Sequence, residues 1–540
     1  LRGPGRYGDT SLREAFASSV TDLDEPLRAL LGRATVFAAP FELAAAEAVL
    51  ADDEADRALV LGRLDALRDR SMLRLLRDEG VGRYALLRSM RPVAQAAISA
   101  ATYARTVERH QAWLASTARD LRGRLDRHGA AEALRRLQRL RDELGAAVAA
   151  SMADSSEAKK LDDDHGAQLL ALAELRLRRG PHEGLVELLS AALKRAPSAE
   201  TTAQLRLVLG RQLIAEGRFG EARVAVEAAV TRVGPEALAL LGQAALRQGR
   251  AEEARAFCAR GLQLCRDGIA VHTTGSLLLV EAEALCSLGH SALAGSAAVP
   301  DAAAVTAERA ADALRAIGDA HLEATALLLI GQRALDTIAA TLAWPTEGPP
   351  AKPSASPQLE RAATCACDAL DLAERAGETR TALAARLLLT VVALSRGDAE
   401  EAALSLQNAQ PALDRVGDAG MRADAAWLQL VVATARGRLS TSLAADAVER
   451  AQVAADRGRM LRAHCWQAAV LRRAGNLDAA EVAIEHAEGW AIGSAVAADL
   501  IVARWLVHGD SVVATPPRGA SAALMAFWLG QLVNRATTSD

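Results

Sequence analysis

The chain has 540 residues, of which 63 are lysine or arginine and 67 are aspartate or glutamate, so its net charge is −4 at pH 7. This weakly acidic balance argues against a general nucleic-acid-binding surface. Hydrophobic residues make up 51% of the chain and aromatic residues only 3%, a composition typical of closely packed helices and poor in strand formers. We therefore expect a mainly α fold.

The first hundred residues predict a small module of helices and one hairpin. After a linker over residues 1–10, we expect helices over Leu12–Val20, Glu25–Phe37, Leu43–Leu50 and Ala58–Arg70. Two short apolar segments follow, Met72–Leu76 and Arg83–Leu87, and the glycine-containing stretch between them is typical of a hairpin connection. Helices followed by a hairpin are winged-helix-like, and we assign this module to residues 11–100.

A module of this kind raises the hypothesis of DNA binding. Its last predicted helix and its hairpin carry seven cations, Arg57, Arg63, Arg68, Arg70, Arg74, Arg77 and Arg83. Four acids interrupt them, Asp65, Asp69, Asp78 and Glu79. Because a phosphate backbone needs a face of cations, we do not favour DNA binding by this module.

Residues 101–150 form a basic helical connector, the most basic stretch of the chain. Its candidate partner-binding residues are Arg119, Arg122, Arg135, Arg136 and Arg139. Two interpretations remain open, a docking surface for an acidic partner or a solvated helix face. Residues 151–166 show no apolar periodicity and predict an irregular linker.

Residues 167–508 predict a repeat array. Small residues recur at one spacing in two successive segments, with Gly210, Gly217, Ala222 and Ala229 in the first and Gly242, Gly249 and Ala254 in the second. The same spacing returns later at Gly397 and Ala402, and again at Gly475 and Ala480. Small residues let two helices approach closely, and a glycine ends the first helix in a left-handed conformation. Each segment is therefore a helical hairpin of a solenoid.

This spacing resembles the tetratricopeptide repeat, which implies a right-handed α-solenoid. Between Gly289 and Gly397 the spacing is degenerate, and we expect two further hairpins there. The proline-rich stretch Trp344–Pro357 predicts a loop that protrudes between two helices of one hairpin. Residues 519–540 predict a C-terminal capping helix and tail.

No pattern of catalytic or metal-binding residues occurs in the sequence. The histidines form no HExxH spacing, no GxSxG elbow surrounds a serine, and Asp162–Asp164 lacks the rest of a calcium loop. The six cysteines are scattered along predicted helices, which favours thiols over a metal or disulfide framework. We expect no enzyme, no catalytic residue, no cofactor and no metal. The apolar runs are too short to cross a bilayer, so we expect a cytoplasmic chain.

Two tryptophans of the last repeats, Trp427 and Trp466, are further candidate partner-binding residues. Large amphipathic rings can anchor a peptide or small ligand. Core packing between the final hairpins is the alternative, and we favour it.

The N-terminal module carries a second resemblance. Ser11–Arg13, Phe41–Val49, Ser71–Leu73 and Arg83–Leu87 occur in the order of the winged-helix module of bacterial STAND regulatory ATPases of the NB-ARC type, the LuxR/AfsR/MalT-like kind. In that family the module lies between a nucleotide-binding domain and a repeat-built sensor and is used as a structural joint, so the resemblance implies a structural joint here. This chain has no Gly-Lys dipeptide and hence no Walker A loop. The position of the family's Met-His-Asp motif reads Arg83-Tyr84-Ala85, so nucleotide sensing there is not expected.

The resemblance implies the regulatory arm of a STAND-type signalling ATPase or transcriptional regulator. Its expected partner is a protein or peptide, with a small inducer as a further alternative. The resemblance also implies ligand-dependent self-assembly with an ATPase domain, and this domain is a candidate partner of the basic connector. We expect no nucleic acid and no membrane as partner. A stand-alone scaffold that joins proteins through its repeats is the alternative function.

Overall fold

The computed structural model describes residues 16–78, 80–153, 161–179, 183–195, 198–265, 271–292, 299–341, 357–416 and 419–490, together with Leu500 and Ala503. The chain divides into two compact units. The first unit comprises residues 1–123, 135–172 and 195–201, and the second comprises residues 124–134, 173–194 and 202–540.

The first unit begins with short helices around an apolar core. The helices are α2 (Glu25–Arg33), α3 (Leu43–Leu50), α4 (Glu54–Asp69), α5 (Arg91–Ala96) and α6 (Ala100–Gly123), with single 3₁₀ turns at Ala34–Val36 and Arg88–Met90. Asp24 caps α2 and Asp53 caps α4, because each carboxylate accepts a backbone N–H of the first turn. Leu31, Leu50 and Leu64 are completely buried in the core of this unit.

A three-stranded antiparallel sheet packs with these helices. Its strands are β1 (Phe41–Glu42), β2 (Leu73–Asp78) and β3 (Val81–Leu86), in the order β1-β3-β2. Tyr84 of β3 pairs with Leu75 on one side and with Phe41 on the other. The predicted hairpin is therefore present, with a connection shorter than expected, whereas β1 was not predicted. The order of helices and hairpin fits the expected module, and its assignment to the winged-helix class stays a prediction.

The predicted linker over residues 151–166 is wrong at both of its ends. Helix α8 (Arg141–Ala153) continues to Ala153, and α9 (Asp163–Arg179) already begins at Asp163. Asp162 caps α9, because its Oδ1 accepts the backbone N–H of His165 at 2.8 Å. The run of three acids was expected to be irregular, but it lies at the positive end of a helix dipole, where acids are favoured. The remaining residues 154–160 lie outside the described part.

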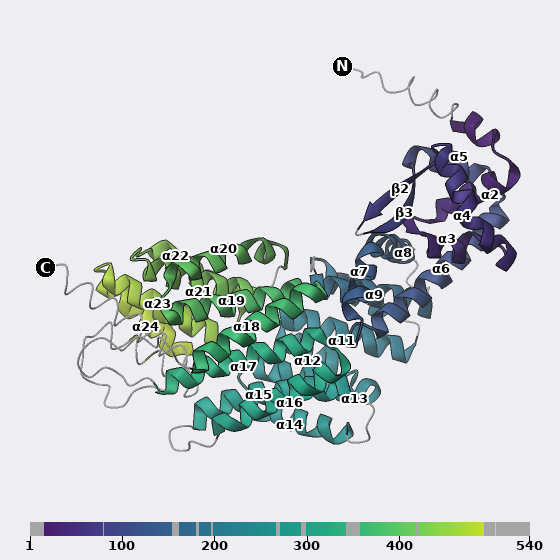
Figure 1. The fold of residues 1–540 in the computed structure, drawn as a ribbon. Coiled ribbons are helices and arrows are strands. Elements are labelled where there is room, and N and C mark those ends of the chain that lie inside the picture. Colours follow the sequence, from purple (N-terminus) through teal and green to yellow (C-terminus); the bar gives the residue numbers. More distant parts are fainter. Residues whose placement is uncertain are drawn as a thin grey trace. The chain divides into compact units, whose positions relative to one another are not determined.

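Helical hairpins build the second unit. Apart from α7 (Ala130–Arg139), its helices are the second half of α9, α10 (Leu185–Lys194), α11 (Ala199–Ala215), α12 (Phe219–Glu227), α13 (Val230–Arg247), α14 (Ala251–Leu264), α15 (Val271–Ala292), α16 (Val299–Ile317), α17 (Ala320–Thr341), α18 (Pro357–Ala376), α19 (Thr379–Arg396), α20 (Ala399–Val416), α21 (Ala419–Ala435), α22 (Thr441–Ala454), α23 (Arg457–Arg473) and α24 (Leu477–Trp490). From α13 onward, each odd-numbered helix packs on the next even-numbered one, and neighbouring pairs stack (Figure 1). The predicted mainly α fold with a helical-repeat array is confirmed.

The small residues used to define the repeat lie where helices meet. A Cβ added to Gly242 of α13 would lie 2.9 Å from Cγ1 of Val280 on α15 and 3.5 Å from the Sγ of Cys258 on α14, and one added to Gly210 of α11 would clash with Val226 of α12. Five alanines of the repeat spacing are completely buried: Ala222, Ala229, Ala254, Ala402 and Ala480. The turn glycines Gly217, Gly249, Gly397 and Gly475 all have positive φ.

Two of these turn glycines give a testable contrast. At Gly475 (φ 82°) an added Cβ would contact nothing, so we expect Gly475→Ala to cost only the left-handed strain, about 1–2 kcal/mol of unfolding free energy. At Gly217 (φ 78°) the Cβ would lie 2.8 Å from the backbone oxygen of Ala454, and we expect Gly217→Ala to cost about 2–4 kcal/mol. Urea unfolding of both variants checks this order, and equal losses would contradict the close contact at Gly217.

Of the two hairpins expected between Gly289 and Gly397, α17–α18 lies wholly in that interval, whereas α16 pairs with α15, most of which precedes Gly289. The proline-rich loop falls between α17, which ends at Thr341, and α18, which begins at Pro357. Residues 342–356 of this loop lie outside the described part, as does the predicted capping helix and tail over 519–540. In the described residues, no helix is both long and apolar enough to cross a membrane.

The array curls until helices far apart in sequence touch. Arg178 at the end of α9 donates to Glu378 just before α19, at a Nη1–Oε1 distance of 2.6 Å. Gly217, after α11, faces Ala454 at the end of α22. The ends of α9 and α11 therefore reach the beginning of α19 and the end of α22. Because of this curl, the first helices of the array contact later helices that they would not reach in an open array.

Candidate functional site

A cluster of charged side chains lies where the curl brings these helices together. We call it the polar cluster. Its members are Asp126, Glu174, Arg178, Arg211, His272, Asp319, His321, Glu378 and Thr381. Every member except Asp126 comes from an odd-numbered helix or from the residue before one. Asp126 comes from the loop between α6 and α7, whose residues 124–134 belong to the second unit.

Arg178 connects two carboxylates of the polar cluster. Its Nη1 donates to Glu378 at 2.6 Å and its Nη2 donates to Asp126 at 2.7 Å. The side chains of Arg178 and Glu378 are 9% and 3% exposed, whereas that of Asp126 is 40% exposed. Burial alone would lower the pKa of the Arg178 guanidinium, but the charges of Glu378 and Asp126 outweigh it and raise that pKa. Burial would likewise raise the pKa of Asp126, but Arg178 and His272 hold it below its usual range.

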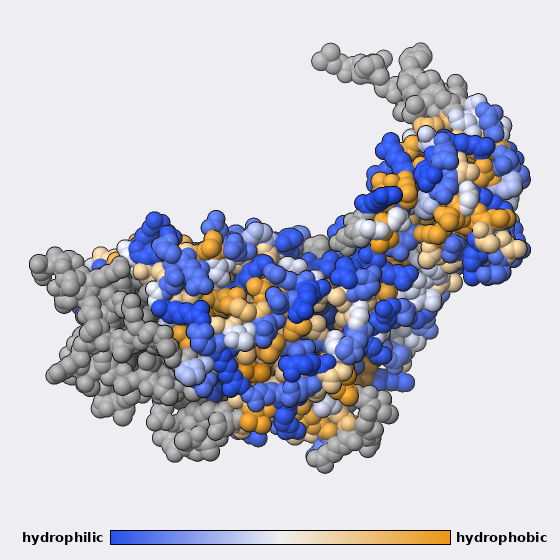
Figure 2. Space-filling view, viewed as in Figure 1, coloured by the Kyte–Doolittle hydropathy of each residue, from blue (hydrophilic) through white to orange (hydrophobic). Residues whose placement is uncertain are grey.

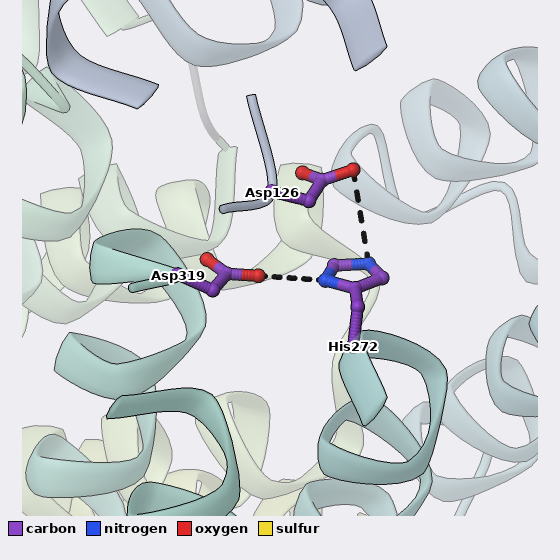
Figure 3. A group of neighbouring side chains, drawn as sticks. All are labelled: Asp126, His272 and Asp319. Atoms are coloured by element: carbon purple, nitrogen blue, oxygen red, sulfur yellow. Dashed lines mark hydrogen bonds and ion pairs between the residues drawn. The ribbon is translucent and has the colours of Figure 1, made fainter. Parts of the chain in front are cut away.

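His272 lies between two carboxylates, as Figure 3 shows. Its Nδ1 is 2.6 Å from Oδ2 of Asp319, and its Nε2 is 3.9 Å from Oδ2 of Asp126. Asp319 is itself fixed, because its Oδ1 accepts the backbone N–H of Leu322 at 3.1 Å and caps α17. Burial alone would lower the pKa of His272, but the hydrogen bond to Asp319 and the charges of both acids outweigh burial and raise it.

Asp126, His272 and Asp319 also form the one group in the described residues that matches a metal-binding set. Two ligands of one metal ion lie about 2.9 Å apart or more when each is about 2.1 Å from the ion. The 2.6 Å between His272 and Asp319 is instead a hydrogen-bond distance, and the other oxygen of Asp126 is already bonded to Arg178. We therefore interpret the group as an imidazole held between two carboxylates.

The remaining members extend the polar cluster on two sides. Arg211 of α11 donates to Glu174 of α9 at 2.8 Å, and the charge of Glu174 raises the pKa of Arg211. His321 lies 3.0 Å from Thr381 Oγ1 and 3.6 Å from Glu378 Oε2. Burial lowers the pKa of His321, and the opposing charge of Glu378 does not restore it. The two histidines therefore prefer opposite protonation states.

This difference predicts opposite pH dependences for two variants. His272 has a raised folded pKa, so its stabilising charge is fully present below its unfolded value near 6.5 and is lost as pH rises through the folded pKa. We expect the stability lost in His272→Gln to be larger at pH 5.5 than at pH 9. Thermal unfolding across this range measures it, and a pH-independent loss would contradict a charged imidazole.

His321 supplies the matched comparison. Its folded pKa is lowered, so its contribution is present above about pH 6.5 and falls as pH drops, because only the unfolded chain then gains the proton easily. We expect His321→Gln to become less harmful as pH falls. The same series of thermal unfolding experiments checks this. If the stability lost in the two variants changed with pH in the same direction, the pH dependence would not come from the two histidines and the expectation would be wrong.

The candidate arginines of the connector are largely engaged within the first unit. Arg119 pairs with Asp164, and Arg139 donates to Glu42 at 2.9 Å with most of its side chain buried. Arg122, Arg135 and Arg136 are half-buried. The five candidate arginines do not form one exposed face, because Arg139 pairs with an acid of β1 and Arg119 with an acid of α9. Their role as a docking surface stays a prediction.

The two candidate tryptophans are buried. Trp427 of α21 and Trp466 of α23 belong to the core of the last hairpins, and the guanidinium of Arg462 lies 4.6 Å above the Trp427 ring. Core packing, the alternative favoured from the sequence, describes their position. Rings in this position present little surface to a partner.

Three of the seven arginines that raised the DNA-binding hypothesis lie in α4 and have acidic partners on that helix. In α4, Arg63 pairs with Asp56, Arg57 with Glu54 at 3.0 Å, and Arg68 with Asp65 at 2.7 Å. Neutralised cations contribute little to phosphate binding. These contacts favour the structural joint.

Sequence reasoning missed the polar cluster because its members are far apart in the chain; Arg178 and Glu378 are separated by 200 positions. One local signal was available. Gly318-Asp319 and Gly377-Glu378 each place an acid directly after a glycine and before a helix, which is where caps occur. That signal locates the two acids at helix starts, but it does not say which cation meets them.

Comparison with known proteins gives distant similarities only. No protein-family model and no curated protein matches the chain. A Rap protein complexed with Competence and Sporulation Factor superposes with a TM-score of 0.48 and 11% identity, over 73% of this chain and 100% of that one. A STAND protein with a tetratricopeptide repeat sensor from Pyrococcus horikoshii gives 0.44 and 14%, over 90% of this chain and 65% of that one. The apo form of RapI gives 0.37 and 12%, over 53% and 97%.

Proposed function

We propose that this chain is the non-enzymatic regulatory region of a STAND-type signalling ATPase or transcriptional regulator, and that its repeat array binds a protein or peptide. The polar cluster is the observation that carries the ligand-binding part. Charges brought together inside a protein cost desolvation energy that apolar side chains of the same size would not. A purely structural array has no need of them.

The accessibility of the polar cluster supports the same proposal. Asp126, His272 and Arg211 keep roughly a quarter to two fifths of their side chains exposed, while Asp319 and Glu378 behind them are buried. Exposed polar groups held in place by buried partners are the arrangement that a binding site needs, since their orientation does not have to be fixed when a ligand arrives.

The N-terminal unit supports the regulatory part of the proposal. Its helices and hairpin follow the order expected from the STAND resemblance, and the paired arginines of α4 favour a joint over a DNA contact. In this role the unit would connect the array to an ATPase domain. A full reading frame with a Walker A and Walker B pair before Leu1 is the expected finding, and a frame that starts at Leu1 would favour the stand-alone scaffold.

A peptide selection tests the ligand-binding part. A random peptide library displayed on phage is selected against the whole chain, and amide hydrogen exchange of the complex then locates the bound peptide. Protection at the beginnings of α15, α17 and α19 is the expected result. Arg436→Gln, which removes an exposed ion pair with Glu400 on the array, is the control and should not change binding. Failure to enrich any peptide, or protection confined to other helices, would contradict the proposal.

A further inference from the structure

The polar cluster contains one group that does not belong to the repeats. Asp126 lies on the loop between α6 and α7. Leu125 of this loop is buried, the backbone N–H of His128 donates to the oxygen of Ile317 at 2.8 Å, and the His128 ring packs beside Gly318. The side chain of Asp126 is nevertheless 40% exposed, whereas the carboxylates of Glu378 and Asp319 are 3% and 1% exposed. Asp126 is therefore the carboxylate of the polar cluster that a ligand from solvent could replace.

The groups around Asp126 form a receptor for a carboxylate. Arg178 Nη2 donates to it at 2.7 Å, and His272 Nε2 faces its other oxygen at 3.9 Å. Arg211 adds positive charge from farther away. Arginine is the residue best suited to recognise a carboxylate, and a buried arginine does so without bulk-water screening.

This receptor does not need Asp126 in order to keep its shape. Arg178 is held from behind by the buried Glu378 at 2.6 Å, and His272 is held by the buried Asp319 at 2.6 Å. With Asp126 removed, one guanidinium N–H and one imidazole N–H would still point at the same place. The site is therefore preorganised for a second carboxylate.

We propose that the polar cluster is a carboxylate-binding site which the chain fills with its own Asp126, and that the ligand of the array is an acidic peptide whose carboxylate replaces Asp126. This inference rests on the proposed function, because it names the ligand class of the same array. Displacement frees the loop 124–129, which joins α6 of the first unit to α7.

Chemical rescue tests the site without any knowledge of the natural ligand. Asp126→Ala removes the internal carboxylate and leaves room for acetate. We expect acetate, titrated against chloride at constant ionic strength, to raise the melting temperature of this variant by about 2 °C or more. The wild type and the control Asp312→Ala, which alters an exposed acid of α16, should not respond. An acetate effect no larger in Asp126→Ala than in Asp312→Ala would overturn the proposal.

Two further variants make the rescue specific. Asp126→Asn keeps the side chain in the site, so acetate should have no effect on it. Adding Arg178→Gln to Asp126→Ala should abolish the response, because the main donor is gone. If Asp126→Ala folds only when acetate is present, that dependence is itself the expected result in a stronger form. A response that survives Arg178→Gln would place the acetate elsewhere and overturn the assignment.

Peptides selected on the wild type then separate the two proposals. We expect acidic sequences to be enriched, to bind Asp126→Ala about tenfold more tightly than the wild type because the internal competitor is gone, and to speed hydrogen exchange at the His128 amide. If the enriched peptides lacked acidic residues, or bound Asp126→Ala no more tightly than the wild type, this inference would be overturned and the proposed function would still stand. Rescue by acetate without any enriched peptide would support the site and overturn the proposed function.

Discussion

Replacing Arg178 by alanine is expected to destabilise the second unit by about 3–5 kcal/mol, the range seen when one partner of a buried ion pair is removed. The reason lies in Glu378, whose side chain is 3% exposed and accepts from Arg178 at 2.6 Å. Without the guanidinium, this carboxylate stays buried beside the His321 ring, whose Nδ1 is 3.6 Å from Glu378 Oε2. Urea unfolding followed by circular dichroism measures the loss, and amide hydrogen exchange should locate it in α9 and α19.

A double-mutant cycle distinguishes this cause from lost packing. Glu378→Gln removes the buried charge, so Arg178→Ala should cost much less in that background than in the wild type. Arg436→Ala is the matched control, because Arg436 makes two hydrogen bonds of 2.9 Å to the exposed Glu400. Its cost should stay below about 1 kcal/mol. Equal costs of Arg178→Ala in both backgrounds would mean that the arginine acts through its aliphatic stem.

Replacing Glu143 by alanine is expected to have an effect of similar size in the first unit, about 3–5 kcal/mol. Glu143 of α8 is 5% exposed and accepts the backbone N–H groups of Ala38 and Ala39 at 3.0 and 2.9 Å. Its Oε1 also lies 2.9 Å from Nε2 of His110 on α6. One carboxylate therefore accepts two backbone N–H groups and lies beside the His110 imidazole, and its loss leaves the two buried N–H groups without this acceptor.

The chain offers a close control for this variant. Asp142→Ala changes the preceding residue, whose side chain is 69% exposed, and should alter stability by no more than about 0.5 kcal/mol. Glu143→Gln keeps one acceptor oxygen and should fall between the two. Amide hydrogen exchange of α6 and α8, measured along a urea titration, reports unfolding of this unit separately from the second. A Glu143→Ala chain as stable as Asp142→Ala would refute the bridging role.

The repeats could be predicted from the sequence because their packing is local. Gly242 meets Cys258 only 16 positions later, and every hairpin repeats the same requirement for small residues, so the spacing itself reveals the contact. Strand β1 could not be predicted in this way, because two residues are too few to show a periodicity and their pairing depends on β3. The start of α9 was missed because a run of acids was interpreted by its lack of apolar residues and not by its capping capacity.

The candidate site lay beyond the same reasoning for a different cause. Asp126, Arg178 and Glu378 meet only because the array curls, and curvature is the sum of small rotations between neighbouring hairpins that no single spacing encodes. In its own sequence context, each of these residues is typical of an ordinary charged side chain at a helix end or in a loop. The tryptophans show the converse, since rarity drew attention to Trp427 and Trp466 although both are buried in the core.

The contacts of the ends of α9 and α11 with the beginning of α19 and the end of α22 have a consequence for how this array can change in evolution. Open solenoids gain or lose whole repeats, because each repeat touches only its neighbours. Here the deletion or duplication of one hairpin between α11 and α17 would carry Glu378 away from Arg178 and Ala454 away from Gly217. The number of hairpins in that interval is therefore fixed by contacts across the curl.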